Sequence, residues 1–482
     1  MARNPDQRRR TSLHYHLIGI GGTAMASLAG LLKAAGHTVT GSDENVYPPM
    51  STGLQQMGIA YRQGYRPENL EPRPDIVIVG NAISRGNPEL EAVLIQKLRY
   101  TSAAATIKEE FIWGHQSMAV AGTHGKTTTT SLLAWALESA GLNPSFLIGG
   151  VAENFGTSFR LTDSKYFVIE ADEYDTAYFD KGPKMWHYLP DTAIVNNIEF
   201  DHADIYRDEE AYEFAFARFI NLIPKNGTLI AGWDSPIVRE LAAKSFAPVE
   251  SFGFGGETTL ASDQPLWHAR DVEFSERGTR FRAFRSDEEW GVVETPLAGA
   301  FNVRNALAVI AAAEAVKADR DGVGEGLRTF TSVKRRMEVR GEIRGVAVID
   351  DFAHHPTAIR ETIDAIRQKY KGRRIIAVYE PRSYTAQRHE FQQDYVRAFR
   401  DADEVVFAAL YRPDRYTKET ALDLGKLVHD LASNGKGAKQ LKDADAIVAD
   451  LSPRLKDRDV VLIMSNGGFG GIHEKLLTAL GK

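Results

Sequence analysis

The stretch Met118-Ala-Val-Ala-Gly-Thr-His-Gly-Lys-Thr-Thr128 decides the fold class of this chain. Its first four residues are an apolar run typical of a buried strand, and a helical pattern through Ala140 follows the glycines. At such a strand-to-helix turn, backbone N–H groups bind phosphate oxygens, while Lys126 would neutralise the phosphates and the Thr127 hydroxyl would ligate Mg²⁺. The predicted ATP-binding loop comprises Gly122, Thr123, His124, Gly125, Lys126, Thr127 and Thr128.

This loop departs from the full phosphate-loop pattern in one place, because the pattern has a glycine where this chain has Val120. The alternative interpretation is a helix-start turn that binds nothing. The residues that follow favour the nucleotide site, since the strands downstream also end in polar residues.

Two of these strand ends carry candidate metal ligands. Glu170 follows the apolar run 167–169, where its carboxylate could hold the same Mg²⁺, although a solvated acidic loop is the plain alternative. His202 follows the run 193–195 and could bind a second ion, whereas a lone histidine is more often structural. The predicted metal ligands are Thr127, Glu170 and His202.

The N-terminal part repeats the strand, glycine turn and helix arrangement. The run 14–20 leads into Gly19-Ile-Gly21-Gly22, and later strands end at Ser42-Asp43 and Gly80-Asn81. This layout puts a pyrophosphate at a helix N-terminus and equally fits an NAD site. The second loop at 122–128 separates the two readings, because a simple dehydrogenase would not need it.

A third unit begins near Thr331 and contains four candidate strands, which are 346–349, 375–379, 405–408 and 460–464. Each strand stops at polar residues, and ligands gather beyond the carboxyl ends of strands in open α/β sheets. Lys334-Arg-Arg336 precedes Asp350-Asp351-Phe-Ala-His354-His355, which combines phosphate-binding cations with carboxylates and imidazoles. A solvated charged face is the alternative. The segment 252–296 has the alternation typical of antiparallel hairpins.

Length and composition agree with a multidomain α/β protein. The chain has 482 residues, 43% hydrophobic content and a net charge of −6, so nothing suggests a general nucleic-acid binder. It lacks cysteine, which excludes disulfides and fits a reducing, cytoplasmic compartment. Residues 8–10 are arginines before an apolar stretch and loosely imitate a secretory signal, but His14, His16 and several glycines interrupt it. No run approaches the roughly 18 apolar residues of a membrane span.

Taken together, these motifs resemble the ATP-dependent Mur ligase family of bacterial cell-wall synthesis over essentially the whole chain. The matching stretches, in family order, are Gly19-Ile-Gly-Gly22, Ala121-Gly-Thr-His-Gly-Lys-Thr-Thr-Thr129, Glu170-Ala-Asp-Glu173, Asp201-His202, Phe301-Asn-Val-Arg-Asn-Ala306, Arg335-Arg336 and Asp350-Asp-Phe-Ala-His-His-Pro356.

The resemblance implies three domains: an N-terminal Rossmann-like parallel sheet that binds UDP-N-acetylmuramate (1–115), a central ATP-binding α/β domain related to P-loop ATPases with added antiparallel hairpins (116–328), and a C-terminal Rossmann-like α/β domain that binds peptide (329–482). It implies ATP and two Mg²⁺ ions, and an amide formed through an acyl phosphate. Because each substrate contacts a different domain, we expect closure of the third domain before chemistry.

Within the family, four stretches look like the branch that joins UDP-N-acetylmuramate to the tripeptide L-Ala-γ-D-Glu-meso-diaminopimelate, in cell-wall recycling. They begin at Gly41, Gly80, Glu170 and Ser465. The related branch that adds L-alanine is the alternative. Rivals of a different class are an NAD-dependent oxidoreductase and a noncatalytic ATP-switched binding protein. We expect a monomer or weak homodimer without nucleic-acid or membrane partners.

The resemblance also assigns residues. The expected catalytic residues are Lys126, Glu170, His202, Arg336 and Asp351. ATP would further contact Asn302, Asn305, Arg336 and Asp351, and the UDP-sugar would contact Gly19, Ile20, Gly21, Gly22, Thr23, Ser42, Asp43, Asn81 and Ala82. The expected peptide-binding residues are His354, Arg382, Arg412, Ser465 and Asn466, with Arg415 as a further candidate because arginine binds carboxylates bidentately.

Two departures from the family pattern bear on these assignments. Family members commonly have histidine at the position of Phe301, so a base or ribose contact there is in doubt. Some relatives bridge two metals with a carbamylated lysine, but residues 203–224 contain no lysine. That device is therefore not expected here.

Overall fold

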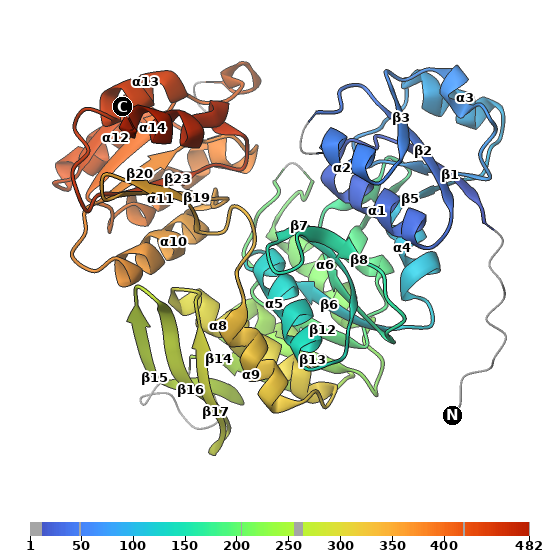
Figure 1. The fold of residues 1–482 in the computed structure, drawn as a ribbon, viewed down its shortest axis with the longest axis horizontal. Helices are drawn as coiled ribbons and strands as arrows, with labels where there is room; N and C mark the ends of the chain where they lie inside the picture. Colours follow the sequence, from blue (N-terminus) through green and yellow to red (C-terminus); the bar gives the residue numbers. More distant parts are fainter. Residues whose placement is uncertain (1–11, 48–49, 204, 255–263, 418–419, 482) are drawn as a thin grey trace.

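The computed structural model describes residues 12–47, 50–203, 205–254, 264–417 and 420–481. The three arginines at positions 8–10 and the two prolines of the 41–50 stretch lie outside these ranges. The described chain forms three α/β units, and in Figure 1 the first unit (blue) and the third (orange to red) lie on opposite sides of the central one. The predicted α/β class with three domains is confirmed, while the boundaries at 115/116 and 328/329 stay predictions.

The first unit is a five-stranded parallel sheet with strand order β3-β2-β1-β4-β5. Its strands are short and largely buried, as expected for a parallel sheet covered by helices. The strands are β1 (His14–Ile18), β2 (Thr38–Asp43), β3 (Ala60–Gln63), β4 (Ile76–Val79) and β5 (Tyr100–Ser102). The helices are α1 (Thr23–Ala34), α2 (Met50–Gln56), α3 (Pro88–Ile95) and α4 (Ala103–Ile107).

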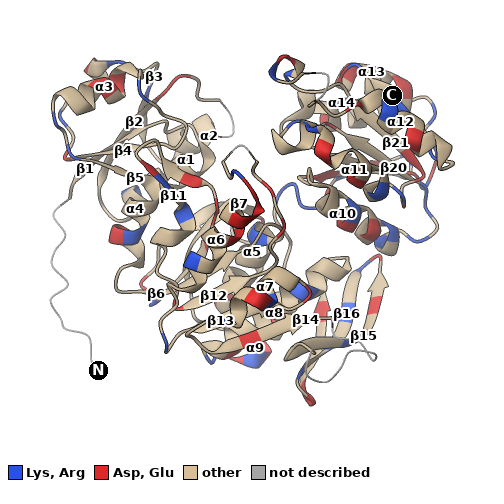
Figure 2. Cartoon of the chain, turned by 180° about the vertical axis from the view of Figure 1, so that it is seen from behind, with Lys and Arg blue, Asp and Glu red and all other residues tan. Residues whose placement is uncertain are grey.

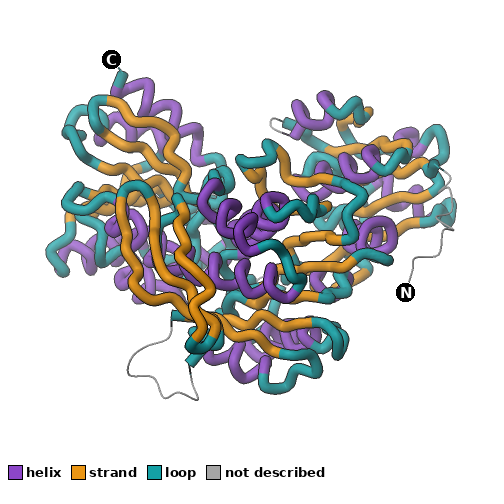
Figure 3. The backbone as a smooth tube through the Cα atoms, turned by 60° about the horizontal axis from the view of Figure 1, so that its bottom comes forward, coloured by secondary structure: helices purple, strands orange, loops and turns teal. Residues whose placement is uncertain are grey.

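The central unit contains a ten-stranded mixed sheet with order β17-β16-β15-β14-β13-β12-β6-β9-β7-β8. Its parallel part comprises β6 (Gln116–Ala121), β7 (Ser145–Ala152), β9 (Tyr166–Glu170), β12 (Thr192–Val195), β13 (Thr228–Gly232) and β14 (Val249–Gly253), with β8 (Thr157–Arg160) antiparallel at one edge. At the other edge lie the antiparallel strands β15 (Trp267–Ser275), β16 (Gly278–Arg285) and β17 (Glu288–Thr295), the long strands that stand out in Figure 3. The predicted hairpins are confirmed for residues 267–295, whereas residues 255–263 of the predicted segment lie outside the described ranges.

Helices cover both faces of the central sheet. They are α5 (Lys126–Ser139), α6 (Glu209–Ile220), α7 (Pro236–Ala242), α8 (Ala300–Ala315) and α9 (Arg320–Thr329). A small hairpin of β10 (Asp175–Ala177) and β11 (Asp180–Pro183) follows β9. The predicted phosphate-loop helix α5 is largely buried and packs against α8 and α9, so the predicted ATP-binding loop leads into a well-packed helix.

The third unit is a six-stranded sheet with order β18-β19-β23-β20-β21-β22, parallel except for the antiparallel edge strand β18. The strands are β18 (Glu338–Ile343), β19 (Val346–Asp351), β20 (Ile375–Tyr379), β21 (Glu404–Ala408), β22 (Gly437–Leu441) and β23 (Val460–Met464). The helices are α10 (Pro356–Lys369), α11 (Gln392–Ala398), α12 (Leu424–Ser433), α13 (Ala444–Leu451) and α14 (Ile472–Leu480).

The hydrophobic clusters join the first and third units to the central unit to different extents. One buried cluster runs from Tyr15 and Phe111 in the first unit to Phe167 in the central unit, where the rings of Phe111 and Phe167 stack 6.3 Å apart. The third unit instead has two clusters of its own, one on each face of its sheet. The first unit is therefore joined to the central one by apolar packing.

Charged residues of both signs are interspersed over all three units (Figure 2). Among the described residues, no helix combines the length and apolar character needed to cross a membrane.

Candidate active site

The predicted ATP-binding loop connects β6 to α5, and neither of its two glycines can be replaced by another residue without moving the loop. Gly122 and Gly125 adopt positive φ values of 132° and 81°. A Cβ on Gly125 would lie 2.9 Å from Nδ2 of Asn196 and 3.0 Å from Oδ1 of Asn305. Only glycine meets both conditions, the backbone conformation and the space. The loop therefore brings the free N–H groups of the first turn of α5 to the carboxyl end of β6, where they can bind phosphate.

Lys126 is held by Glu173, a residue that the sequence analysis did not assign. Its Nζ donates to both carboxylate oxygens of Glu173, at 2.9 and 2.7 Å, and to the carbonyl of Gly122 at 2.7 Å. Burial disfavours the ammonium, but the carboxylates of Glu173 and Asp172 outweigh it and raise the pKa of Lys126. Burial likewise disfavours the Glu173 carboxylate, yet Lys126 and His202 lower its pKa to about 2. Both groups are ionised, and a phosphate must compete for Lys126.

Thr127, Glu170 and Arg336 meet beside this pair. The Thr127 hydroxyl donates to Oε1 of Glu170 at 3.0 Å, and Nη2 of Arg336 lies 3.2 Å from Oγ1 of Thr127. Burial raises the pKa of Glu170 even though Lys126 opposes the shift. A buried carboxylate and a hydroxyl at this separation are oxygen ligands of the kind that Mg²⁺ takes. The donor set therefore fits a magnesium ion.

His202 lies on the other side of Glu173. Its Nε2 is 3.1 Å from Oε1 of Glu173, and its backbone has a positive φ of 57°. Burial disfavours the imidazolium, but the hydrogen bond to Glu173 and the charge of Asp201 raise the pKa of His202. The structure brings His202 to the carboxylate that also holds Lys126.

A cavity of about 90 Å³ lies between the central and third units and collects the remaining predicted ATP contacts. Asn302 and Asn305 reach it from α8, where Nδ2 of Asn305 donates to Oδ1 of Asn302 at 3.0 Å. Asp351 reaches it from the end of β19, accepting from the N–H groups of Met337 and Ala353 at 2.8 Å each. Burial raises the pKa of Asp351. Other lining residues are His124, Gly125, Thr128, Phe301 and Arg336.

The N-terminal glycine turn is tied to the end of β2. The N–H groups of Gly19 and Ile20 both donate to the carbonyl of Ser42, at 2.8 and 3.0 Å, and the N–H of Gly21 donates to Oδ2 of Asp43 at 2.9 Å. The Ser42 hydroxyl is buried against Glu89 of α3, with 2.8 Å between the oxygens. Gly22 and Thr23 then start α1, while Asn81 and Ala82 follow β4 in the neighbouring strand-end loop.

Three of the predicted peptide-binding residues lie together at the ends of β20 and β23. Arg382 stacks on the ring of Tyr411, with 4.0 Å from its guanidinium carbon to the ring centroid, and pairs with Glu380. The Ser465 hydroxyl donates to Glu380 at 2.6 Å, and Oδ1 of Asn466 is buried with no hydrogen-bond partner among the described residues. A backbone N–H of a bound peptide could donate a hydrogen bond to this oxygen.

The other predicted peptide-binding residues, His354, Arg412 and Arg415, make different contacts. Arg412 is exposed and pairs with Asp414, and Arg415 is exposed in the same turn. Nδ1 of His354 lies 3.0 Å from the carbonyl oxygen of Phe352. The side chain faces the central unit, where the charge of Asp201 opposes the lowering of its pKa. Burial lowers the pKa of His354. Arg412 directly follows Tyr411, the residue on which Arg382 stacks.

Sequence reasoning missed four site residues that the structure places around the loop. They are Glu173, Asn197, Glu199 and His355. The N–H of His124 donates to Oδ1 of Asn197 at 2.8 Å, and Nε2 of His124 lies 3.0 Å from Oε2 of Glu199. All four stand inside polar runs that were recognised as strand ends. Their roles depend on distances between strand ends, which spacing along the chain does not give.

The profiles of one protein family match all three units. Residues 14–110 match the description "Mur ligase family, catalytic domain", residues 120–313 match "Mur ligase middle domain", and residues 335–467 match "Mur ligase, glutamate ligase domain". Together these matches cover most of the chain.

Individual relatives match over the full length. The UDP-N-acetylmuramate–L-alanyl-γ-D-glutamyl-meso-2,6-diaminoheptandioate ligase of Haemophilus influenzae is 42% identical over 97% of this chain and 99% of its own length. A UDP-N-acetylmuramate–L-alanine ligase of Desulforapulum autotrophicum is 31% identical over 97% of this chain and 98% of its own. The crystal structure of a murein peptide ligase from Psychrobacter arcticus is 37% identical with a TM-score of 0.72, covering 98% of this chain and 99% of that chain.

Proposed function

The chain belongs to the Mur ligase family, and we propose that it joins UDP-N-acetylmuramate to the tripeptide L-alanyl-γ-D-glutamyl-meso-diaminopimelate. It is an ATP-dependent ligase that forms an amide bond. The observation that carries the substrate assignment is 42% identity, over 97% of the chain, to a ligase whose name states these two substrates, against 31% to an alanine ligase. The reaction would return a cell-wall peptide to a sugar nucleotide, which is a recycling step.

The chemistry divides into two displacements. The lactyl carboxylate oxygen of UDP-N-acetylmuramate attacks the γ-phosphorus of ATP, which gives an acyl phosphate and ADP. The alanyl amine then attacks the acyl carbon, phosphate leaves, and the amine proton passes to solvent or a nearby base. Phosphoryl transfer depends mainly on positioning and on stabilising the charge of the transferred group. Lys126 and Arg336 are the cations beside the loop that would do this.

The same corner would hold magnesium. Thr127 and Glu170 supply oxygen ligands for one ion, and His202 would serve a second. When bound, Mg²⁺ neutralises charge on the phosphates and orients them. The protein's own contribution is to keep Lys126 charged and, through Glu173, at the mouth of the loop until a triphosphate displaces the carboxylate.

The other two substrates would come from the outer domains. The glycine turn at Gly19–Gly22, with Asp43, supports a UDP site in the first domain, because a helix N-terminus favours pyrophosphate. The peptide would bind the third domain at Arg382, Ser465 and Asn466, since its carboxylates suit a guanidinium and its backbone suits the unpartnered amide oxygen. His354, Arg412 and Arg415 remain candidates for further peptide contacts.

A substrate panel tests the proposal directly. The purified protein would be incubated with Mg²⁺, ATP and UDP-N-acetylmuramate, together with either the tripeptide or free L-alanine, and the UDP-linked product identified by mass. We expect the tripeptide product with a much higher kcat/KM than the alanine product. Preference for free alanine would assign the chain to the alanine-adding branch. ATP hydrolysis without amide would indicate a switch, and turnover independent of ATP would indicate a different class of enzyme.

Two properties of the protein in solution are part of the same proposal. We propose a monomer or weak homodimer that works in the cytoplasm, where ATP and UDP-sugars are available. Mass photometry over a range of concentrations would measure the oligomeric state.

A further inference from the structure

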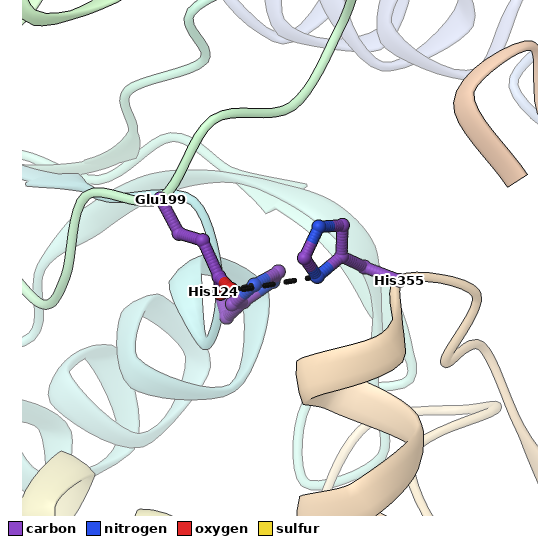
Figure 4. Close-up of side chains that lie close together, drawn as sticks. All are labelled: His124, Glu199 and His355. Atoms are coloured by element: carbon purple, nitrogen blue, oxygen red, sulfur yellow. Dashed lines mark hydrogen bonds and ion pairs between the residues drawn. The ribbon is translucent and has the colours of Figure 1, made fainter. Parts of the chain in front are cut away.

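Three side chains from separate segments converge beside the phosphate loop. His124 comes from the loop itself, Glu199 from the segment after β12, and His355 from the residue before α10 in the third domain. Figure 4 shows the two imidazoles and the carboxylate pointing toward one another. The imidazole rings lie 5.0 Å apart, centroid to centroid. None of the roles proposed for the ligase reaction uses this convergence.

The distances suit a small cation with nitrogen and oxygen ligands. Oε2 of Glu199 lies 3.0 Å from Nε2 of His124 and 3.8 Å from Nδ1 of His355, and the three ligand atoms all lie within 4.8 Å of one another. Tetrahedral Zn²⁺ with bonds of about 2.0–2.1 Å needs its ligand atoms roughly 3.4 Å apart. Small rotations of the side chains would therefore bring the three atoms to that geometry.

The protonation states also suit a cation. Burial and the neighbouring His124 lower the pKa of His355 to about 4, so its imidazole is neutral at physiological pH. Burial opposes ionisation of Glu199, but the hydrogen bonds from His124 and Thr357 outweigh it and lower the pKa of its carboxyl to about 2. Metal binding requires a neutral imidazole and an ionised carboxylate.

The surroundings orient the ligand atoms. The Thr357 hydroxyl donates to Oε1 of Glu199 at 2.7 Å, which fixes the carboxylate and leaves Oε2 turned toward the imidazoles. Such supporting hydrogen bonds are typical of metal ligands. The N–H of Thr357 also reaches Nδ1 of His355, at a long 3.4 Å, and a cation would replace this contact. His124 borders the cavity of about 90 Å³, so a fourth position is open on that side.

We propose that His124, Glu199 and His355 bind a first-row transition-metal cation, Zn²⁺ in the first instance, at a site distinct from the magnesium site at Thr127 and Glu170. Two imidazoles and one carboxylate select for zinc-like cations over Mg²⁺, which prefers oxygen. Because His355 belongs to the third domain and its partners to the central one, the cation ties the two domains together beside the ATP pocket. The site stands on this geometry and does not depend on the identity of the peptide substrate.

The test uses the full-length protein stripped of metals, with Co²⁺ as the probe and excess Mg²⁺ present. The visible absorption of Co²⁺ bound by nitrogen ligands reports the site, and calorimetry with Zn²⁺ gives its affinity. The variants are His124→Asn and His355→Asn, since asparagine keeps the N-terminal cap of α10 that His355 supplies. His389→Asn is the matched control, because His389 is an exposed histidine beside Glu390 in the same domain.

We expect one equivalent of Co²⁺ in the wild type and in His389→Asn, and affinity at least about tenfold weaker in both site variants. Equal affinity in all four proteins would overturn the site and leave a purely polar contact between domains. Weakening in His124→Asn with wild-type affinity in His355→Asn would overturn the link between domains. Glu199→Gln keeps the hydrogen bond from Thr357 and serves as the second variant if His355→Asn fails to fold.

Discussion

Lys126 is the residue whose replacement has the most informative consequences, because it is both the proposed contact of the triphosphate and one partner of a buried ion pair. The side chain of Glu173 has no solvent exposure, and Lys126 is its cationic partner. Removing one partner of a buried ion pair leaves an uncompensated charge and typically costs about 3 kcal/mol or more, and His202 would compensate part of this. We expect Lys126→Ala to abolish amide formation and to lower the free energy of unfolding by up to about 3 kcal/mol.

The double variant Lys126→Ala, Glu173→Gln separates these two effects. It removes both charges, so chemical denaturation should give a free energy of unfolding closer to that of the wild type than the single variant gives. Amide formation, measured by mass, should remain absent in both. Wild-type activity in Lys126→Ala would contradict the proposed contact with the triphosphate.

Gly125 tests whether the loop itself binds the nucleotide. Gly125→Ala puts a methyl group 2.9 Å from Asn196 Nδ2 and imposes a positive φ on alanine, so the loop must move. We expect the KM for ATP to rise at least about tenfold, which corresponds to about 1.4 kcal/mol of lost binding. Steady-state kinetics at saturating UDP-N-acetylmuramate and tripeptide would measure it.

Gly36→Ala is the matched control for that substitution. Gly36 also has a positive φ, of 90°, but a Cβ there meets no atom of the described residues within 4 Å. Alanine in a left-handed conformation costs about 1–2 kcal/mol in stability. A lower melting temperature with an unchanged KM for ATP is therefore expected. A similar rise in KM in Gly36→Ala would mean that general destabilisation explains both variants.

At the scale of elements, β21 begins in a charge cluster on the third sheet. Glu404, its first residue, accepts from Arg454 at 2.7 and 2.5 Å and from Arg374 at 2.6 Å. Partial burial disfavours the carboxylate, but hydrogen bonds from Arg454 outweigh it and lower the pKa of Glu404 below its ordinary 4.5. A group of this kind stabilises the fold above its ordinary pKa and loses that contribution as the pH falls through the folded value.

Glu404→Gln should therefore destabilise the protein by about 1 kcal/mol at neutral pH, after allowing for solvent screening. The difference from the wild type should shrink at pH values below 4.5. Calorimetric unfolding at several pH values would measure both. Glu325→Gln is the control, because Glu325 pairs with Arg328 on the exposed face of α9 and should change the transition little. A difference that persists unchanged in acid would rule out ionisation as its cause.

Strand prediction succeeded where strands are buried on both faces. The runs 375–379 and 460–464 coincide with β20 and β23, whose residues are all buried and strongly β-branched. The edge strands β18 and β22 were missed, because they are half-exposed and rich in charged residues and glycine, as in Glu338-Val-Arg-Gly-Glu-Ile343. Edge strands obtain their order from pairing with a neighbour, and a local pattern carries little of that information.

The candidate site shows the same division between local and long-range information. Glycines 122 and 125 could be assigned from the sequence, because a strand, a turn and a helix determine the local geometry of a phosphate loop. The pairing of Lys126 with Glu173 and the approach of His124 to His355 could not, since they depend on strand order and on the position of one domain against another. Neither quantity is encoded in spacing along the chain.

At the scale of the whole molecule, the two outer domains are attached differently. The first shares a hydrophobic cluster with the central domain, whereas the third has its own clusters and makes several polar contacts with the central domain beside the cavity. Arg304 pairs with Asp234 at 3.3 Å and with Glu361 of the third domain at 2.5 Å, and Thr357 donates to Glu199. Polar interfaces of this kind allow domain motion more readily than apolar ones. We therefore expect the third domain to be the one that moves.

The size of the cavity between the central and third domains leads to a test of this motion. Ligand pockets usually measure about 300–1,000 Å³, and the cavity of about 90 Å³ is smaller, so we expect the third domain to move when ATP binds. The chain has no cysteine, so pairs of introduced cysteines can carry spin labels specifically. The positions Ile95→Cys, Phe246→Cys and Ala432→Cys are exposed and lie in the first, central and third domains.

We expect ATP with UDP-N-acetylmuramate to narrow and shift the distribution of spin-label distances between positions 246 and 432. The distribution between positions 95 and 246 should stay unchanged, because apolar packing fixes that pair of domains. Identical distance distributions between positions 246 and 432 with and without nucleotides would contradict domain closure. An equal shift in the 246–432 and 95–246 distances would mean that the motion is not confined to the segment joining the central and third domains.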